Sequence, residues 1–332
     1  MSGVPPRLTF SLGEMFPAYR APKWLPGGHA QTIYPLAIKA PPPAYRRERW
    51  DTPDGDFIEL DWIDGGKDAP LVVLFHGLEG SSASHYAVSL MSALRQRGWA
   101  GVVSHFRGCS GKPNRLPRAY HSGDSAEIDW ILHRLRRQFP QRTIFAAGVS
   151  LGGNALAKWL GEREEAAGEV VAGAAVVSAP LDLTLSGHQL GRGFNRVYTQ
   201  HFLATLKKTA ARKLALFPGL FDGTRLDGVR NLYEFDDLVT GPLHGYTGAD
   251  DYWCRASAKP LLRGIRVPTL LLNARNDPFL PAHGLPQPDE MSASVTAEFP
   301  HQGGHVGFVT GSLPGRLDWL PQRLLHFFDQ LR

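Results

Sequence analysis

The chain has few cysteines, no long apolar run and no large excess of one charge. Its 332 residues include two cysteines, Cys109 and Cys254, which are too few for a disulfide framework and lack the short spacing of a metal site. The longest apolar stretch, residues 170–177, has the length of a strand and falls far short of the roughly 18 residues that cross a membrane. The first residues do not join a basic segment to an apolar core, so no secretory leader is expected. These absences predict a cytoplasmic protein without a transmembrane segment and without a bound metal.

The charges are nearly balanced, with 36 basic and 31 acidic residues and a net charge of +5. Short arginine clusters at 46–47 and 134–137 are typical of a solvated surface, because no basic stripe or nucleic-acid motif accompanies them. We therefore expect no nucleic-acid partner. Contact with a membrane surface stays open, and the oligomeric state is not determined by these features.

Apolar runs alternate with helical patterns along most of the chain. A hairpin is expected over residues 45–63, around a turn at 52–55. The later runs predict buried strands at 71–75, 100–105, 143–147, 170–178, 267–273 and 294–299. Helical patterns lie between them at 84–98, 124–139 and 153–160, and a last one covers 317–331. This alternation predicts an α/β fold, a mostly parallel twisted sheet with helices on both faces.

Two segments depart from the alternation. Residues 1–44 are rich in proline and aromatic side chains, so an extended N-terminal arm is expected there, with a turn pinned by polar side chains at 28–32. Residues 181–263 are helical, basic and aromatic, and we expect them to form an inserted helical cap. The core is then made of residues 45–180 and 264–332.

A Gly-Val-Ser-Leu-Gly sequence at residues 148–152 lies between a predicted strand and a predicted helix. Such a strand, glycine-framed serine and helix describe a nucleophile elbow, a tight turn that raises the serine above the sheet edge. Ser150 is therefore the candidate nucleophile. The N–H of Leu151, at the start of the new helix, is a candidate oxyanion donor.

A serine nucleophile needs a base and an acid, which in α/β-hydrolases follow in the order Ser, Asp or Glu, His. Asp277 follows the strand at 267–273, and His305 follows a Gly-Gly turn after the last strand. His301 stands four residues earlier, and the glycine turn favours His305 over it. Leu78, in the loop after the strand at 71–75, is the second candidate oxyanion donor.

Motifs along nearly the whole chain resemble those of the YheT-like branch of the α/β-hydrolases, whose relatives include membrane-associated phospholipases and acylglycerol lipases. The matching stretches are residues 28–32, 76–81, 106–111, 113–115, 120–123, 148–153, 276–278 and 304–307. The resemblance implies a Ser-Asp-His hydrolase without a cofactor, in which Ser150, Asp277 and His305 occupy the motif positions.

The sequence therefore predicts an enzyme that cleaves carboxylic esters, with short- to medium-chain or lipid-like acyl groups, through an acyl-enzyme. Phe194 and Phe202 in the expected cap are candidates for binding the acyl chain. The same triad would serve an amidase, thioesterase, acyltransferase or perhydrolase, and a noncatalytic binding protein could share the fold. The natural acyl group and alcohol, and the role of Cys109 near the site, stay open.

Overall fold

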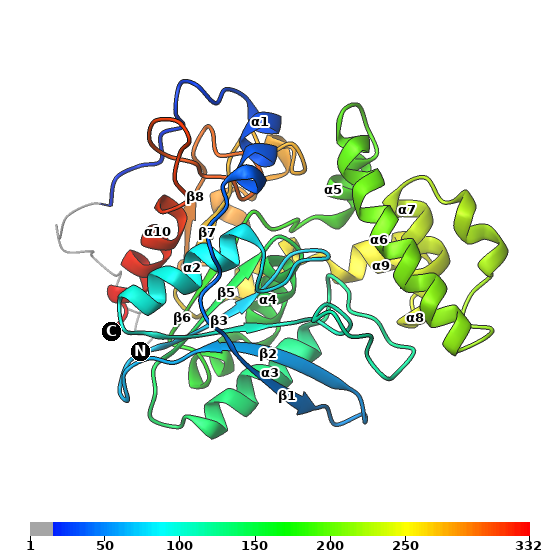
Figure 1. The fold of residues 1–332 in the computed structure, drawn as a ribbon, viewed down its shortest axis with the longest axis horizontal. Coiled ribbons are helices and arrows are strands. Elements are labelled where there is room, and N and C mark those ends of the chain that lie inside the picture. The colour runs from blue at the N-terminus through cyan, green and yellow to red at the C-terminus, as the bar shows by residue number, and fades with distance from the viewer. Residues whose placement is uncertain (1–15) are drawn as a thin grey trace, which may run out of the picture.

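The computed structural model describes residues 16–332. Its centre is one eight-stranded sheet in the order β1-β2-β4-β3-β5-β6-β7-β8 (Figure 1). The strands are β1 (Arg46–Asp51), β2 (Phe57–Ile63), β3 (Leu71–Phe75), β4 (Ala100–Ser104), β5 (Ile144–Val149), β6 (Gly173–Val177), β7 (Thr269–Leu272) and β8 (Val295–Glu298). The hairpin β1–β2 and the β2–β4 pair are antiparallel, and all pairs from β4 to β8 are parallel. The predicted mostly parallel sheet is confirmed.

Helices cover both faces of this sheet, which explains why its middle strands are largely apolar. Along β3, Leu71, Val73 and Phe75 belong to one core cluster, whereas Val72 and Leu74 belong to the other. The helices of the first face are α3 (Ser125–Gln138) and α4 (Leu151–Arg163), and those of the second are α2 (His85–Gln96) and α10 (Trp319–Asp329). Helix α4 begins at Leu151, directly after the serine, as expected.

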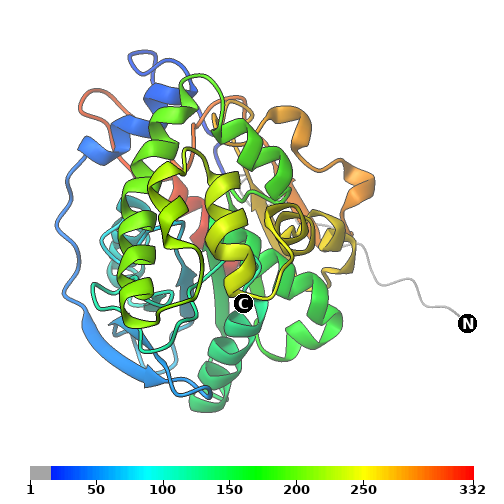
Figure 2. The same cartoon turned by 90° about the vertical axis from the view of Figure 1, so that its right-hand side faces the viewer.

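Between β6 and β7 the chain forms only helices and turns within the described residues. The α-helices are α5 (Leu183–Leu190), α6 (Asn195–Leu216), α7 (Leu232–Phe235), α8 (Gly241–Leu243) and α9 (Ala249–Ala256). They pack around two small apolar clusters of their own. Figure 2 shows this helical segment in front of the sheet, with α6 running along it.

The described part of the N-terminal segment has no long helix, as the prolines predict. It contains α1 (Gly28–Ile33) and the 3₁₀ turn η1 (Tyr34–Ala37), so the turn expected at 28–32 is instead a short helix. The prediction for residues 1–15 lies outside the described residues. Across residues 16–332, no helix has both the length and the apolar composition that a membrane crossing needs.

Candidate active site

Ser150 stands in a strained turn between β5 and α4, with a φ of 53°. A side chain at position 148 would meet the Gly152 carbonyl oxygen at 2.5 Å, and one at position 152 would meet the Phe75 carbonyl oxygen at 2.4 Å. Only glycine fits at both positions, because no Cβ atom tolerates such contacts with backbone. The turn therefore has the form of a nucleophile elbow.

The side chain of His305 lies between Ser150 and Asp277. Its Nε2 is 3.0 Å from Ser150 Oγ, and its Nδ1 is 2.8 Å from Asp277 Oδ2. The Asp277 side chain is completely buried, and its Oδ1 accepts a hydrogen bond of 2.9 Å from the Phe279 N–H. A proton on Nδ1 donates to the carboxylate and leaves Nε2 able to accept the hydroxyl proton of the serine. His301, the alternative base, is exposed.

Two backbone N–H groups beside Ser150 are without an acceptor within residues 16–332, those of Leu78 and Leu151. Their neighbours are engaged. The N–H groups of Gly77 and Glu79 donate to tyrosine hydroxyls at 2.8 and 2.9 Å, and that of Gly152 donates to a backbone carbonyl at 3.1 Å. Both residues line the same cavity as Ser150, so their free donors are available to an oxygen atom bound there.

His76 shapes the loop that carries Leu78. Its Nδ1 lies 2.8 Å from the Gly77 carbonyl oxygen, and its Nε2 accepts from the Phe106 N–H at 3.1 Å. Burial lowers the pKa of His76 to about 3, so the ring is neutral at physiological pH. A neutral ring with both nitrogens engaged in hydrogen bonds holds the loop in place.

Helix α1 joins the turn that carries Asp277 to the turn that carries His305. The Gln31 side chain is buried, and its Oε1 accepts from Asn276 Nδ2 and from the Gly303 N–H, each at 2.9 Å. Thr32 Oγ1 accepts from the His305 N–H at 2.9 Å. The polar side chains at 28–32 thus form hydrogen bonds as expected, but their partners lie in the turns that carry Asp277 and His305. The sequence offered one signal for this, polar residues inside an apolar, aromatic segment.

Two cavities meet at Ser150. The inner cavity has a volume of about 160 Å³ and extends under α5, α6 and α9; the outer groove has about 600 Å³ and runs between α1, α2 and α6. His305 and Phe202 line both. The inner cavity is mostly apolar, as an acyl chain requires.

Phe194 lies outside both cavities. It lines neither cavity, is 53% exposed, and packs its ring 4.7 Å from the ring of His29. The reason is its position at the start of α6, where the helix passes α1 beyond the mouth of the site. Of the two phenylalanines expected to bind an acyl chain, only Phe202 contacts the cavities.

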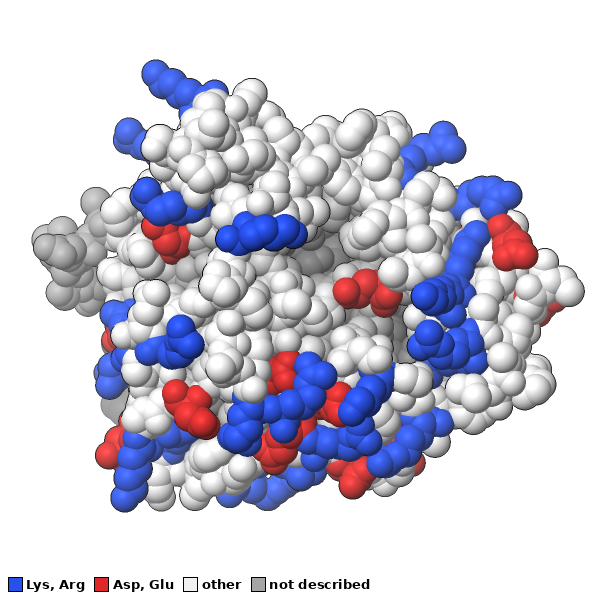
Figure 3. Space-filling model, viewed as in Figure 1, with Lys and Arg blue, Asp and Glu red and all other residues white. Residues whose placement is uncertain are grey.

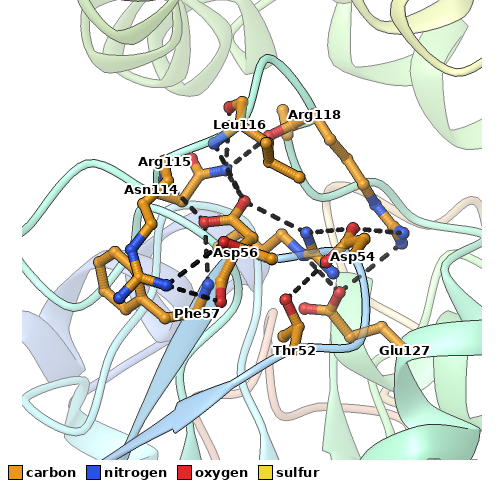
Figure 4. A network of polar contacts seen from close by, with 12 residues as sticks. Thr52, Asp54, Asp56, Phe57, Asn114, Arg115, Leu116, Arg118 and Glu127 are labelled. Atoms are coloured by element: carbon orange, nitrogen blue, oxygen red, sulfur yellow. Dashed lines mark hydrogen bonds and ion pairs between the residues drawn. The ribbon is translucent and has the colours of Figure 1, made fainter.

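A buried polar network holds the loop that forms one wall of the inner cavity (Figure 4). Asp56 accepts from Asn114 Nδ2 at 2.6 Å, and the guanidinium of Arg107 donates to Glu127 at 2.6 Å. Lys213 of α6 donates to Asn114 Oδ1 at 2.7 Å, which connects the helical segment to this network. Burial lowers the pKa of Lys213 to about 8.

Cys109 lies on the same loop and lines the inner cavity. Burial raises the pKa of its thiol well above the usual range, so the thiol is protonated at neutral pH and is a weak nucleophile. Among the described side chains, no three His, Cys, Asp or Glu residues are grouped as a metal site would need.

The comparisons with known proteins agree with the fold. A family model described as the alpha/beta hydrolase fold matches residues 70–312, so the chain belongs to that family. The chain is 44% identical to the Escherichia coli (strain K12) protein “Putative esterase YheT”, over 83% of this chain and 82% of that one. The predicted resemblance to the YheT-like branch is thereby confirmed.

More distant relatives carry lipase names. Phospholipase ABHD3 of Homo sapiens is 28% identical over 93% of this chain and 78% of its own length. The structure of the Pyrococcus furiosus esterase Pf2001 superposes with a TM-score of 0.57 at 14% identity, covering 86% of this chain and 90% of that one, which shows a shared fold. The chain is an ester hydrolase of the α/β-hydrolase superfamily.

Proposed function

We propose that the chain cleaves carboxylic esters through an acyl-enzyme on Ser150, with His305 as general base and Asp277 as the residue that orients it. The observation that carries this is the continuous pair of contacts, 3.0 Å from Ser150 Oγ to His305 Nε2 and 2.8 Å from His305 Nδ1 to Asp277 Oδ2. Serine is a poor nucleophile until a base within hydrogen-bond reach takes its proton.

In the first half-reaction, Ser150 Oγ attacks the carbonyl carbon of the ester while His305 Nε2 takes the hydroxyl proton. The resulting oxyanion accepts hydrogen bonds from the N–H groups of Leu78 and Leu151. The Asp277 carboxylate stabilises the imidazolium, which then gives its proton to the departing alkoxide. In the second half-reaction water attacks the acyl-enzyme with the same base, and the acid is released.

Residues 181–263 act in this proposal as a cap that forms the acyl pocket. An apolar cavity of about 150 Å³ holds a ring of six carbons in other proteins, and the inner cavity here has about 160 Å³. A medium acyl chain of about six carbons therefore fits it. The outer groove, which also reaches Ser150, takes the alcohol part of the ester.

Labelling with a fluorophosphonate tests the nucleophile directly. We expect the wild-type chain to be labelled on Ser150, and Ser150→Ala to lose both the label and the hydrolysis of p-nitrophenyl hexanoate, by a factor on the order of 10⁴–10⁶. Ser312→Ala, a change at an exposed serine, is the matched control and keeps both. Unchanged turnover by Ser150→Ala would refute the assignment, and faster cleavage of the matching thioester would move the chain to a different substrate class.

A further inference from the structure

Large apolar side chains are exposed at one end of the molecule. Within residues 16–332 the exposed large apolar residues are Ile33, Leu36, Phe194, Val197, Leu216 and Leu313. All except Leu216 lie on three neighbouring pieces of chain, namely α1 with η1, the start of α6, and the loop that contains Leu313. We name these five residues the apolar rim.

The three pieces touch one another. His29 of α1 packs its ring 4.7 Å from the ring of Phe194, and its Nδ1 lies 3.1 Å from the hydroxyl of Tyr198. Trp24 Nε1 donates to the Gly311 carbonyl at 3.0 Å, which ties the loop of Leu313 to the N-terminal segment. Figure 2 shows α1 beside the upper end of α6. The residues of the apolar rim therefore lie on segments that adjoin one another.

The segments that carry the rim contain cations and no carboxylates. Residues 16–47, 183–221 and 299–317 include no Asp or Glu. The cations next to the rim are Lys23, Lys39, Arg192 and Arg196, which are exposed and have no ion-pair partner in the described part of the chain. In Figure 3 the upper edge of the face shows Lys and Arg but no acidic atoms, and most acidic atoms lie in the lower half.

Part of the rim borders the outer groove. Ile33, Leu36 and Lys39 line this groove, which leads inward to Ser150 and His305. The acidic lining residues of the groove are Glu79, which accepts a hydrogen bond of 2.7 Å from the Tyr120 hydroxyl, and Asp318, which is paired with Arg316 at 2.8 Å. A partner seated on the rim would therefore face the entrance of the site across a positive and apolar surface.

We propose that the rim docks on a lipid surface with anionic headgroups, and that the ester substrate is a lipid that enters the outer groove from that surface. The proposal rests on the proposed function. Exposed apolar side chains insert at the headgroup boundary, while nearby cations are attracted to anionic lipid. A second copy of the chain is a poorer occupant, because it would set the same uncompensated cations against one another.

Flotation with lipid vesicles tests the surface without using catalysis. The Ser150→Ala chain, with its full sequence, is mixed with vesicles of equal parts phosphatidylglycerol and phosphatidylcholine, or of phosphatidylcholine alone. We expect at least tenfold more protein on the anionic vesicles at low salt, and a loss of that binding at high salt, because salt screens the attraction. Equal binding to both vesicles, or none to either, would overturn the proposal.

Matched variants separate the rim from the rest of α6. Val197→Glu on the rim should lower binding at least tenfold, whereas Leu216→Glu, a similarly exposed residue at the opposite end of the same helix, should not. Arg192→Gln and Arg196→Gln should each lower vesicle binding about fivefold. The control for charge is the pair Lys208→Gln and Arg212→Gln. Equal losses from rim and control variants would overturn the proposal.

The outcome is independent of the proposed chemistry. Val197→Glu is also made in the chain that retains Ser150. This variant should cleave the soluble ester p-nitrophenyl hexanoate as fast as the wild type, because Val197 lines neither cavity. Failure of the docking surface then leaves that activity intact, and failure of the proposed function leaves vesicle binding intact. A dimer that Val197→Glu dissociates, with no binding to vesicles, would assign the rim to a second copy and refute the lipid surface.

Discussion

Replacing the hydroxyl of Thr32 should displace the proposed base, His305, while that residue itself stays unchanged. Thr32 is 9% exposed; its Oγ1 accepts the N–H of His305 at 2.9 Å and donates to the Gly28 carbonyl at 2.7 Å. Thr32→Val keeps the shape of the side chain and removes the acceptor. The partly buried His305 N–H is then left without a partner in the native arrangement.

The cost follows from that N–H group. An unsatisfied buried donor costs about 1–3 kcal/mol, and about 1.4 kcal/mol corresponds to a factor of ten in rate. If the His305 turn shifts to recover a partner, the imidazole leaves its position 3.0 Å from Ser150 Oγ. We therefore expect kcat/KM to fall between about fivefold and 150-fold, mainly through kcat, because valine keeps the shape of Thr32 where it lines the outer groove.

The assay is hydrolysis of p-nitrophenyl hexanoate with kcat and KM determined separately, together with the thermal midpoint of each variant. Thr32→Ser retains the hydroxyl and should stay within about threefold of the wild type, since the acceptor is kept. A Thr32→Val chain with lower thermal stability and an unchanged kcat would refute the reasoning. So would a Thr32→Ser chain as impaired as Thr32→Val.

Three further expectations follow from the site. His305→Ala should lose at least about 10⁴-fold in kcat, whereas His301→Ala should stay near the wild type; the reverse pattern in the same ester assay would move the base. Phe202→Ala should reduce the preference for hexanoate over acetate esters, because Phe202 lines the inner cavity; an unchanged ratio of kcat/KM values would remove it from the acyl pocket. Burial raises the pKa of Asp236 to about 6, above the value near 3.9 of an unfolded chain. The folded state therefore binds this proton more tightly, and the resulting stability is present below about pH 4 and lost as pH rises through 6. Asp236→Asn should consequently melt a few degrees higher than the wild type at pH 7.5 and lose this advantage near pH 4, as followed by circular dichroism; a lower midpoint at pH 7.5 would contradict it.

The sheet and the three side chains at its edge could be predicted because their signals are local. Ser150, Asp277 and His305 each follow a predicted strand, and glycines frame the turns of the first and the last. Parallel strands bring their carboxyl ends to one edge of the sheet, so local positions translate into spatial neighbours. The 3.0 and 2.8 Å contacts agree with that expectation.

The role of α1 could not be predicted, because its partners are distant along the chain. The Gln31 bond to Asn276 spans 245 residues, and the Thr32 bond to His305 spans 273. No periodicity or turn residue signals such a pairing. A polar side chain in an irregular segment suggests a turn, and only the tertiary structure shows that it is buried between two loops.

The orientation of α6 could not be predicted from the sequence for a different reason. Its buried positions include Asn195, Thr199 and Lys213, whose side chains bond to groups outside the helix. The exposed end instead carries the apolar Phe194 and Val197. An apolar stripe normally marks the buried face of a helix, so the sequence pattern points to Phe194 as a pocket residue although its side chain is exposed.

The strained residues of the chain show why anchors such as Thr32 should affect activity more than stability. Six non-glycine residues of the described part have positive φ angles, and three of them line the cavities at the site, namely Glu79, Ser150 and Val306. Such conformations each cost about 1–3 kcal/mol and persist only where the surroundings enforce them. Ser178 Oγ, for example, accepts the N–H of Val306 at 3.2 Å, next to the proposed base. Removing an anchor lets the neighbouring backbone relax and recovers part of the lost stability, but the relaxed backbone no longer holds His305 over Ser150. The loss therefore falls on kcat.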